Sequence, residues 1–312
     1  MQTGLEQYTL RFGGACDQPR LSVVIPFLRH DPCPLLERLA HAPKGVEFIL
    51  LDDGSGAIDL LSRVIVAAER LHAPTSIIVS TRNRGRAEAR NRLISEARGE
   101  YVLFLDADML PDARDFVSRW LALIEREHPR VAFGGLSVRQ AHATDETALH
   151  FNLFSSSDCR SADERKLTPA WSIASANLLV RRDLLNEVRF DDGFKGWGWE
   201  DIDWALRAAE QAPIVHIDNP ASHIGLDSVE TLLRKSAEAG PNFARLAAKH
   251  PRAVRRFPSW RAARTLKRTP GRRALRSVCS WIARDPAHAA PMPLRRAALK
   301  LYRASYYAEH LP

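Results

Sequence analysis

The stretch Tyr101–Met109, YVLFLDADM, carries five largely apolar residues that run into two aspartates one residue apart. Such an apolar run is typical of a central strand that is buried on both faces, as in a parallel sheet. Asp106 and Asp108 then follow the carboxyl end of the strand, where ligands bind in open α/β sheets. A hard cation such as Mg²⁺ or Mn²⁺ relieves their mutual repulsion. A solvated turn is the structural alternative for so short a pattern.

Strand and helix patterns alternate around this stretch. The alternation predicts an α/β fold with a mainly parallel central sheet that is flanked by helices. Residues 1–20 are expected to supply an edge strand or a cap, and residues 142–167 are expected to form an irregular, mobile loop. The predicted strands are 21–27, 46–51, 76–80, 101–105 and 131–138, and the predicted helices are 35–42, 58–71, 84–97, 111–127 and 200–209.

The charge of the chain is unevenly distributed. Residues 229–312 carry 19 Lys and Arg against 4 Asp and Glu, a net charge of +15, whereas residues 1–228 carry 26 against 33, a net charge of −7. We therefore expect a main domain over 1–228 and a basic helical C-terminal extension over 229–312. The acidic main domain and the lack of a recognisable nucleic-acid-binding motif argue against nucleic acid as a partner. Without a leader sequence or a run of about 18 apolar residues, a cytoplasmic protein is expected.

Two further segments place polar side chains at the same edge of the predicted sheet. The strand 46–51 runs into Asp52-Asp53-Gly54-Ser55, where an aspartate can accept hydrogen bonds from a base or ribose. The alternative is a strand–turn–helix junction in which Gly54 permits the turn and Ser55 caps the next helix. The helix 84–97 begins with Arg84, Arg86 and Arg90, which either reach a diphosphate or form a solvated basic face.

These motifs, taken in order, resemble the nucleotide-binding half of the family 2 glycosyltransferases with the GT-A fold. The resemblance rests on VVIP (23–26), DDGS (52–55), NRGRAEARN (83–91) and LDADM (105–109), joined by GWGWED (196–201) on the acceptor side. The last block is similar to that of galactosyltransferases and chondroitin-type polymerases. The resemblance covers about residues 21–228 and implies a nucleotide-binding half over about 21–138 and an acceptor half over about 139–228.

The resemblance implies roles for residues in each motif. Asp52 matches the contact to the nucleotide base, Asp106 the contact to ribose or sugar, and Asp108 a ligand of Mn²⁺ or Mg²⁺. His223 matches a further metal ligand, with His216 as the competing choice and a structural histidine as the alternative. The implied nucleotide-sugar site consists of Pro26, Asp52, Asp53, Asn83, Arg86, Arg90, Asp106, Ala107 and Asp108, and the implied acceptor site consists of Asn177, Gly196, Trp197, Gly198 and Trp199.

Glu200 and Asp201 follow the glycine–tryptophan repeat and open the predicted helix 200–209. An acid pair in a first helical turn is stabilised by the helix dipole, which is the structural alternative to a catalytic role. Within the motif set we expect Asp201 to be the general base that deprotonates the acceptor hydroxyl, and Glu200 to hold a hydroxyl group. By resemblance, the transfer inverts the anomeric configuration and uses a nucleoside-diphosphate sugar, with a UDP-sugar expected first.

The two tryptophans of GWGWED offer flat faces that can stack on a sugar ring. Because alternate residues of an extended segment face opposite ways, we expect Trp197 to be the acceptor platform and Trp199 to be nearer the core. Gly196 and Gly198 let the backbone approach a ligand closely. The acceptor is expected to be a saccharide or a lipid-linked saccharide.

The basic extension 229–312 is expected to form short, broken helices. Its last helix, 293–310, places Leu294, Ala298, Leu301, Ser305 and Ala308 on one face. With interleaved aromatic residues, this pattern suits helices that lie on an anionic membrane surface, on the cytoplasmic face. A solvated extension or an oligomer contact is the alternative.

Three other interpretations compete with a glycosyltransferase. A haloacid-dehalogenase-like phosphatase would use Asp106 as its nucleophile, but that motif normally continues with Thr or Val where Met109 stands. A sugar-nucleotide pyrophosphorylase would need a glycine-rich loop after the first strand, which PFLRHDPCP (26–34) does not provide. A non-catalytic protein would act on membrane or nucleic acid through its basic tail.

Overall fold

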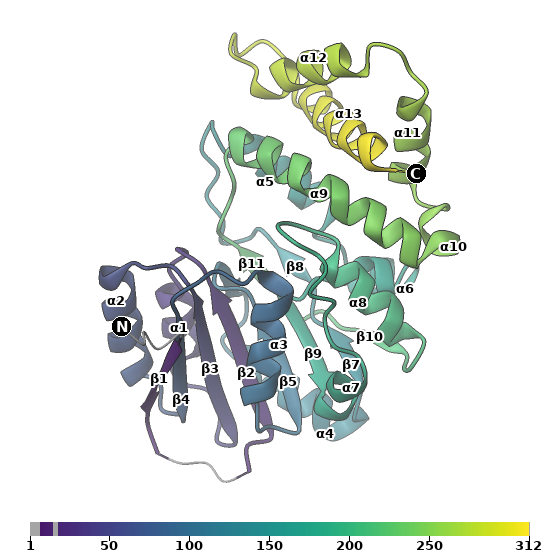
Figure 1. Cartoon of the computed structure of the whole chain (residues 1–312). Helices are drawn as coiled ribbons and strands as arrows, with labels where there is room; N and C mark the ends of the chain where they lie inside the picture. The colour runs from purple at the N-terminus through teal and green to yellow at the C-terminus, as the bar shows by residue number, and fades with distance from the viewer. Residues whose placement is uncertain (1–6, 15–17, 312) are drawn as a thin grey trace, which may run out of the picture. The chain divides into compact units, whose positions relative to one another are not determined.

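The computed structural model describes residues 7–14 and 18–311 and contains two compact units (Figure 1). This division differs from the single boundary expected at residue 228, because two internal segments group with the C-terminal helices. The sheet unit comprises Met1–Ala141, Asp158–Asp192 and Trp204–Gly225, and the helical unit comprises His142–Ser157, Gly193–Asp203 and Leu226–Pro312.

An eight-stranded sheet forms the core of the sheet unit. Its strands lie in the order β1 (Gln7–Phe12), β4 (Thr75–Ser80), β3 (Val46–Asp53), β2 (Leu21–Phe27), β5 (Tyr101–Leu105), β9 (Asn177–Arg181), β7 (Val131–Phe133) and β10 (Ile214–His216). The pairs within β4-β3-β2-β5 and the β7-β10 pair are parallel. Strand β9 is antiparallel to both its neighbours, and β1 is antiparallel to β4. The mainly parallel α/β fold is therefore confirmed, and the N-terminal segment supplies an edge strand.

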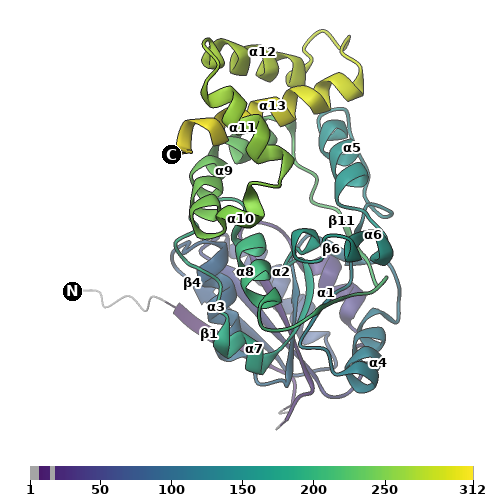
Figure 2. The same cartoon turned by 90° about the vertical axis from the view of Figure 1, so that its right-hand side faces the viewer.

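Helices cover both faces of this sheet. Helices α1 (Cys33–Leu39) and α3 (Arg86–Glu96) lie on opposite faces, as Figures 1 and 2 show. Strand β5 is buried along its whole length, and Leu103 and Phe104 have no exposed surface. Burial of each such side chain contributes about 1.5–3 kcal/mol. The other helices that contribute to this unit are α2 (Ile58–Glu69), α4 (Phe116–Glu127), α6 (Ala162–Lys166), α7 (Arg182–Glu187) and α8 (Glu200–Ala209), which begins in the helical unit.

A second, three-stranded sheet follows the end of β5. It has the order β6 (Met109–Pro111), β11 (Ala221–His223) and β8 (Leu136–Ser137). The single strand expected over 131–138 is thus wrong, because the chain bends between β7 and β8 at two glycines. Gly135 has a φ of +89°, and a Cβ atom there would overlap the Arg165 guanidinium. The bend carries the chain from one sheet into the other.

The segment 142–167 is not the irregular loop that its composition predicts. It contains helix α5 (Ala148–Ser157) and helix α6, and a 3-10 turn η1 (Ala170–Ser172) follows it. Helix α6 begins with a capping box, in which Ser161 and Glu164 bond each other's backbone N–H groups. Two reciprocal bonds of this kind satisfy donors that would otherwise be free, so even a five-residue helix is well defined.

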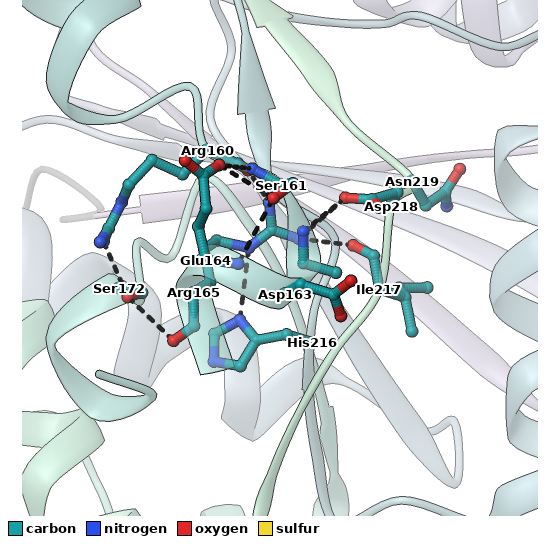
Figure 3. A network of polar contacts seen from close by, with 12 residues as sticks. Arg160, Ser161, Asp163, Glu164, Arg165, Ser172, His216, Ile217, Asp218 and Asn219 are labelled. Atoms are coloured by element: carbon teal, nitrogen blue, oxygen red, sulfur yellow. Dashed lines mark hydrogen bonds and ion pairs between the residues drawn. The ribbon is translucent and has the colours of Figure 1, made fainter. Parts of the chain in front are cut away.

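Arg165 joins α6 to the edge of the main sheet (Figure 3). Its side chain is 1% exposed, and its guanidinium donates hydrogen bonds to the backbone oxygens of Arg160 and Ile217. Its Nε also lies 3.3 Å from Nδ1 of His216, the last residue of β10. Burying a charged group is costly unless its donors are satisfied, and this network satisfies them.

The helical unit is built around α9 (Val229–Lys249), which continues through Pro241. This helix is longer than the short, broken helices expected for the extension. Leu232 of α9 and Leu149 of α5 share one apolar cluster with Leu299 of α13 (Met292–His310), so residues 142–157 belong to this core. The remaining helices are α10 (Pro251–Val254), α11 (Pro258–Lys267) and α12 (Arg272–Arg284). No helix within residues 7–14 and 18–311 has both the length and the apolar composition needed to cross a membrane.

The buried histidine of the Arg165 network predicts a pH-dependent stability. Burial, together with the charge of Arg165, lowers the pKa of His216 from 6.5 to about 4. Between these pH values the unfolded chain binds a proton that the folded protein does not, so stability should fall with decreasing pH, by about 3 kcal/mol at pH 4. Urea unfolding between pH 7 and 4 measures this. His216→Asn, which keeps an acceptor for Arg165, should show a weaker dependence of the unfolding free energy on pH. An unchanged dependence would contradict the assignment of this effect to His216.

Candidate active site

The carboxylate of Asp106, directly after β5, pairs with two arginines of α3. Its Oδ1 lies 3.1 Å from Nη2 of Arg90, and its Oδ2 lies 3.3 Å from Nη2 of Arg86. The Arg90 side chain is 1% exposed, whereas that of Arg86 is 40% exposed. The pair with Arg90 is therefore shielded from water, whereas the pair with Arg86 is partly exposed to solvent. The alternative of a fully solvated basic face on this helix is wrong for Arg90.

Asp108 lies against His223, and the small sheet brings the two together. His223 of β11 is registered against Met109 of β6, and the Ile224 N–H donates to the Asp108 backbone oxygen at 2.9 Å. The His223 Nε2 atom is consequently 3.2 Å from Oδ2 of Asp108. Burial alone would raise the pKa of the Asp108 carboxyl, but the hydrogen bond from His223 and nearby positive charges lower it to about 2.

The Asp108–His223 pair fits part of a divalent-cation site. A carboxylate and an imidazole suit Mn²⁺, and ligand atoms about 2.1 Å from one ion lie about 3 Å apart. A Cβ atom at Gly225 would overlap the Asp108 carboxylate, so the chain beside the pair must be glycine. Among the described residues, no group of three or more His, Cys, Asp or Glu could hold an ion. Phosphate or water oxygens would have to complete the coordination. His216, the competing choice, contacts Arg165 instead.

Asp52 and Asp53 organise the turns at the end of β3. Asp52 Oδ1 accepts from the Ser55 N–H at 2.8 Å, and Asp53 accepts from the N–H groups of Arg84 and Gly85 at 3.0 and 3.1 Å. Burial raises the pKa of Asp53 despite these bonds. Asp53 thus ties the end of β3 to the start of α3. The alternative in which Ser55 caps the next helix is wrong, because the N-cap of α2 is Ala57.

The other implied nucleotide-binding residues surround the same strand ends. Pro26 is half-buried near the end of β2, and Ala107 is buried between the two aspartates. Asn83 is exposed, and its Oδ1 accepts from the Gly85 N–H at 2.8 Å. All three belong to the sheet unit, as do Asp106 and Asp108.

Asn177 is not placed to contact an acceptor. Its side chain has no exposed surface, and its amide donates to the backbone oxygens of Gly135 at 2.8 Å and Asn219 at 2.9 Å. The amide therefore braces the bend between β7 and β8. The expected acceptor-binding role of Asn177 is corrected to a structural one on these grounds.

The glycine–tryptophan loop belongs to the helical unit and is held by one side chain of α9. Asn242 is 4% exposed, and its Nδ2 donates to the backbone oxygens of Lys195, Gly198 and Trp197 at 2.8, 3.0 and 3.3 Å. The alternation argument expected an extended loop. The loop is not extended, since Gly196, Gly198 and Trp199 all have positive φ. Glycine adopts a positive φ readily, whereas Trp199 does so only where surrounding contacts impose it, and Asn242 fixes the backbone directly before Trp199.

The two tryptophans of this loop have different surroundings. Trp199 packs on Phe243 with ring centroids 5.0 Å apart, and its indole N–H donates to the Tyr307 hydroxyl at 3.2 Å. It is thus part of the packing of the helical unit. The Trp197 ring instead lies 5.8 Å from Nζ of Lys235 and 5.8 Å from Cζ of Arg303. Of the two, we retain only Trp197 as a candidate acceptor platform.

The acidic residues of α8 differ in exposure. Glu200 is 4% exposed, whereas Asp201 is half-buried and in partial contact with solvent. Asp203 is fully buried, and its Oδ1 lies 2.6 Å from Nζ of Lys249 and 3.0 Å from Nε2 of His250. Asp203 therefore has a structural role at the end of α9. Of the acids in this turn, Asp201 is the more accessible member of the expected catalytic pair.

Sequence reasoning missed the residues that support the site from outside the motifs. Gly225, Asn242 and Arg303 lie far along the chain from the groups they contact, so no local spacing indicates them. For Asn242, a weak signal exists: it follows Pro241 within a helical pattern, where an amide has no local role.

Comparisons with known proteins identify the family and the fold. The sequence model of Glycosyl transferase family 2 matches residues 22–189. A dodecaprenyl-phosphate galacturonate synthase of Rhizobium johnstonii is 35% identical over 114 residues, which are 34% of this chain and 33% of that protein. The chain spans only about a third of the curated relatives it matches, 37% and 33% of their lengths.

Solved structures share the fold. The mannosyltransferase PcManGT from Pyrobaculum calidifontis, in complex with GDP-Man and Mn²⁺, has a TM-score of 0.59 at 18% identity, covering 94% of this chain and 87% of that one. S. aureus TarS 1-349, in complex with UDP-GlcNAc, has a TM-score of 0.52 at 18% identity, covering 91% and 89%. The fold is therefore that of the GT-A glycosyltransferases. Because the family match covers more than half of its residues, the chain belongs to glycosyl transferase family 2.

Proposed function

We propose that this glycosyltransferase moves a sugar from a nucleoside-diphosphate sugar, with a UDP-sugar as the first choice, to a hydroxyl of a saccharide or lipid-linked acceptor. The observation that carries the proposal is the Asp108–His223 pair beside the arginine-bound Asp106 at the end of β5. The nucleotide sugars in the complexes of PcManGT and TarS support it by analogy. Membership of the family makes the phosphatase interpretation wrong.

The sheet unit supplies the donor side of the proposed reaction. Asp108 and His223 would hold Mn²⁺ or Mg²⁺, which offsets negative charge on the departing diphosphate. Arg86, whose side chain is 40% exposed, is assigned to a phosphate oxygen of the donor. The buried Arg90 keeps Asp106 in place, and Asp52, at the end of β3, is assigned to the nucleotide base. Charges that are already oriented need no rearrangement during the reaction.

The helical unit supplies the acceptor side. Asp201, in the first turn of α8, takes the proton of the acceptor hydroxyl as its oxygen attacks the anomeric carbon. One direct displacement inverts the configuration at that carbon. Asn242 is a positioning residue, because it holds the backbone of the loop from which α8 begins.

Replacing Asp108 tests the donor side. With Mn²⁺ and a panel of nucleotide sugars, the wild-type protein should gain thermal stability and slowly hydrolyse its donor. Asp108→Asn should lower the hydrolysis rate by on the order of 10² or more, because the charge that holds the cation is lost. Asp192→Asn, at an exposed aspartate of the same unit, is the matched control and should retain the rate. An Asp108→Asn variant as active as the control would reject the site.

Replacing Asp201 tests the acceptor side separately. Asp201→Asn should reduce sugar transfer by roughly 10²–10⁴, the usual contribution of a general base. Donor binding, followed by thermal stabilisation with Mn²⁺ and the nucleotide sugar, should not change. A transfer rate within about threefold of wild type would assign the base elsewhere.

The helical unit also supports a proposed contact with an anionic membrane surface. Trp281 and Val278 of α12 are 61% and 54% exposed, on a unit rich in arginine. Helix α13 does not present the single face expected from its sequence, since Ala298 is buried whereas Leu294 and Leu301 are exposed. Exposed apolar residues with basic neighbours are the pattern of interfacial helices.

Vesicle binding tests this contact. Wild-type protein should sediment with vesicles containing phosphatidylglycerol and not with phosphatidylcholine vesicles. The double change Val278→Ser and Trp281→Ser should weaken binding about tenfold or more, because apolar area no longer enters the interface. Ile58→Ser, at an 81% exposed residue of the sheet unit, controls for loss of surface hydrophobicity in general. Equal weakening by both changes would argue against a specific membrane surface.

A further inference from the structure

The ring of Trp197 is flanked by two cations from different helices. Lys235 of α9 and Arg303 of α13 each lie 5.8 Å from the ring centroid, within the range of a cation–π contact. Lys235 also contacts Asp227, with Nζ 2.7 Å from Oδ2. One ammonium has three donors, so this contact leaves others unused. The surroundings of Trp197, the proposed acceptor platform, are therefore positively charged.

Arg303 differs from the other arginines around it. Arg276 pairs with Glu309 at 2.7 Å, Arg295 donates to the Ala283 oxygen at 3.1 Å, and Arg296 lies 3.3 Å from the Asn152 oxygen. Arg303 has a buried Nε with no hydrogen-bond partner among residues 7–14 and 18–311. No carboxylate in the described part of the chain lies within ion-pair distance of it.

A partly buried guanidinium without an anion is costly, and the cation–π contact offsets only part of that cost. A bound oxyanion would remove the remaining cost by pairing with the guanidinium. A guanidinium offers parallel donors that match a phosphate, and an ammonium adds a compact charge. A neutral sugar ring stacked on Trp197 would leave Arg303 without a counter-charge, whereas Lys235 already pairs with Asp227.

We propose that Arg303 and Lys235 form a phosphate-binding subsite beside Trp197, so that the acceptor saccharide carries a phosphate group close to the sugar ring that stacks there. This inference rests on the proposed function, because the subsite would select the acceptor of the proposed sugar transfer. It assigns a substrate class: phosphorylated saccharides, whether the phosphate bears a lipid or is free.

The subsite can be tested without any sugar transfer. Inorganic phosphate is titrated at constant ionic strength, and binding is followed by calorimetry. Arg303→Gln should bind phosphate about tenfold or more weakly than wild type, because the fork of donors is lost. Lys300→Gln removes one charge from an exposed position of the same helix and should bind as wild type does. Arg303→Lys, which keeps the charge, should bind with intermediate affinity, and it replaces Arg303→Gln if that variant does not fold.

A second readout separates this proposal from the proposed function. Donor hydrolysis by the wild-type protein tests the proposed function alone, because it requires no acceptor. With acceptors, Arg303→Gln should raise KM about tenfold for a phosphorylated saccharide and leave KM unchanged for its dephosphorylated form. Lipid-phosphate and water-soluble phosphate acceptors, compared in detergent, distinguish the two sources. Phosphate binding that is equal in Arg303→Gln and wild type, or lost equally in Lys300→Gln, would overturn the subsite.

Discussion

A single side-chain contact, between the Asp108 carboxylate and the His223 imidazole at 3.2 Å, requires most of the sheet unit to be in place. Strand β5 must bring the aspartate to the sheet edge, and β6 must turn away from it. Strand β11 must then enter between β6 and β8, so that His223 is registered against Met109. Gly225 must leave space for the carboxylate. The contact therefore depends on the register of the small sheet, and every residue assigned to the donor is placed relative to it.

The two units carry opposite electrostatic tasks. In the sheet unit, the carboxylates of Asp106 and Asp53 are each held by donors, either arginine side chains or backbone N–H groups. In the helical unit, basic residues outnumber the acidic residues that could neutralise them. Arg303, whose Nε has no hydrogen-bond partner among the described residues, is one such basic residue. A divalent cation and a diphosphate suit the first environment, and an anionic acceptor or surface suits the second. The proposed donor-binding and acceptor-binding residues therefore lie in parts of the chain that differ in charge.

Much of the fold could be predicted from the sequence because the main strands are buried on both faces. Continuous apolar runs such as 21–27 and 101–105 have few other interpretations. The prediction failed where side chains distant in sequence decide the conformation. The strand 131–138 is broken because glycines accommodate Arg165 and Asn177. The supposed loop 142–167 forms helices because a capping box and the apolar cluster of α9 order it.

For the site, local motifs predict where the carboxylates lie, but not the surroundings of side chains that depend on packing. Asp106 and Asp108 lie at the end of a strand whatever surrounds them. Asn177 has the same polarity as a ligand-binding residue, and only the three-dimensional structure shows that both its donors are already used. Trp199 does pack in the core of the helical unit, as expected, but the argument from an extended chain does not hold, since left-handed residues interrupt the alternation in its loop.

The hold of Asn242 on the glycine–tryptophan loop has a consequence for how such enzymes diverge. Asn242 lies 44 to 47 residues from the loop residues that it bonds, yet it fixes their backbone conformation. A chimera that joins this sheet unit and loop to the C-terminal helices of another family member would keep the loop's sequence and lose its shape. Conversely, substitutions confined to α9 can change the conformation of this loop without altering any family motif.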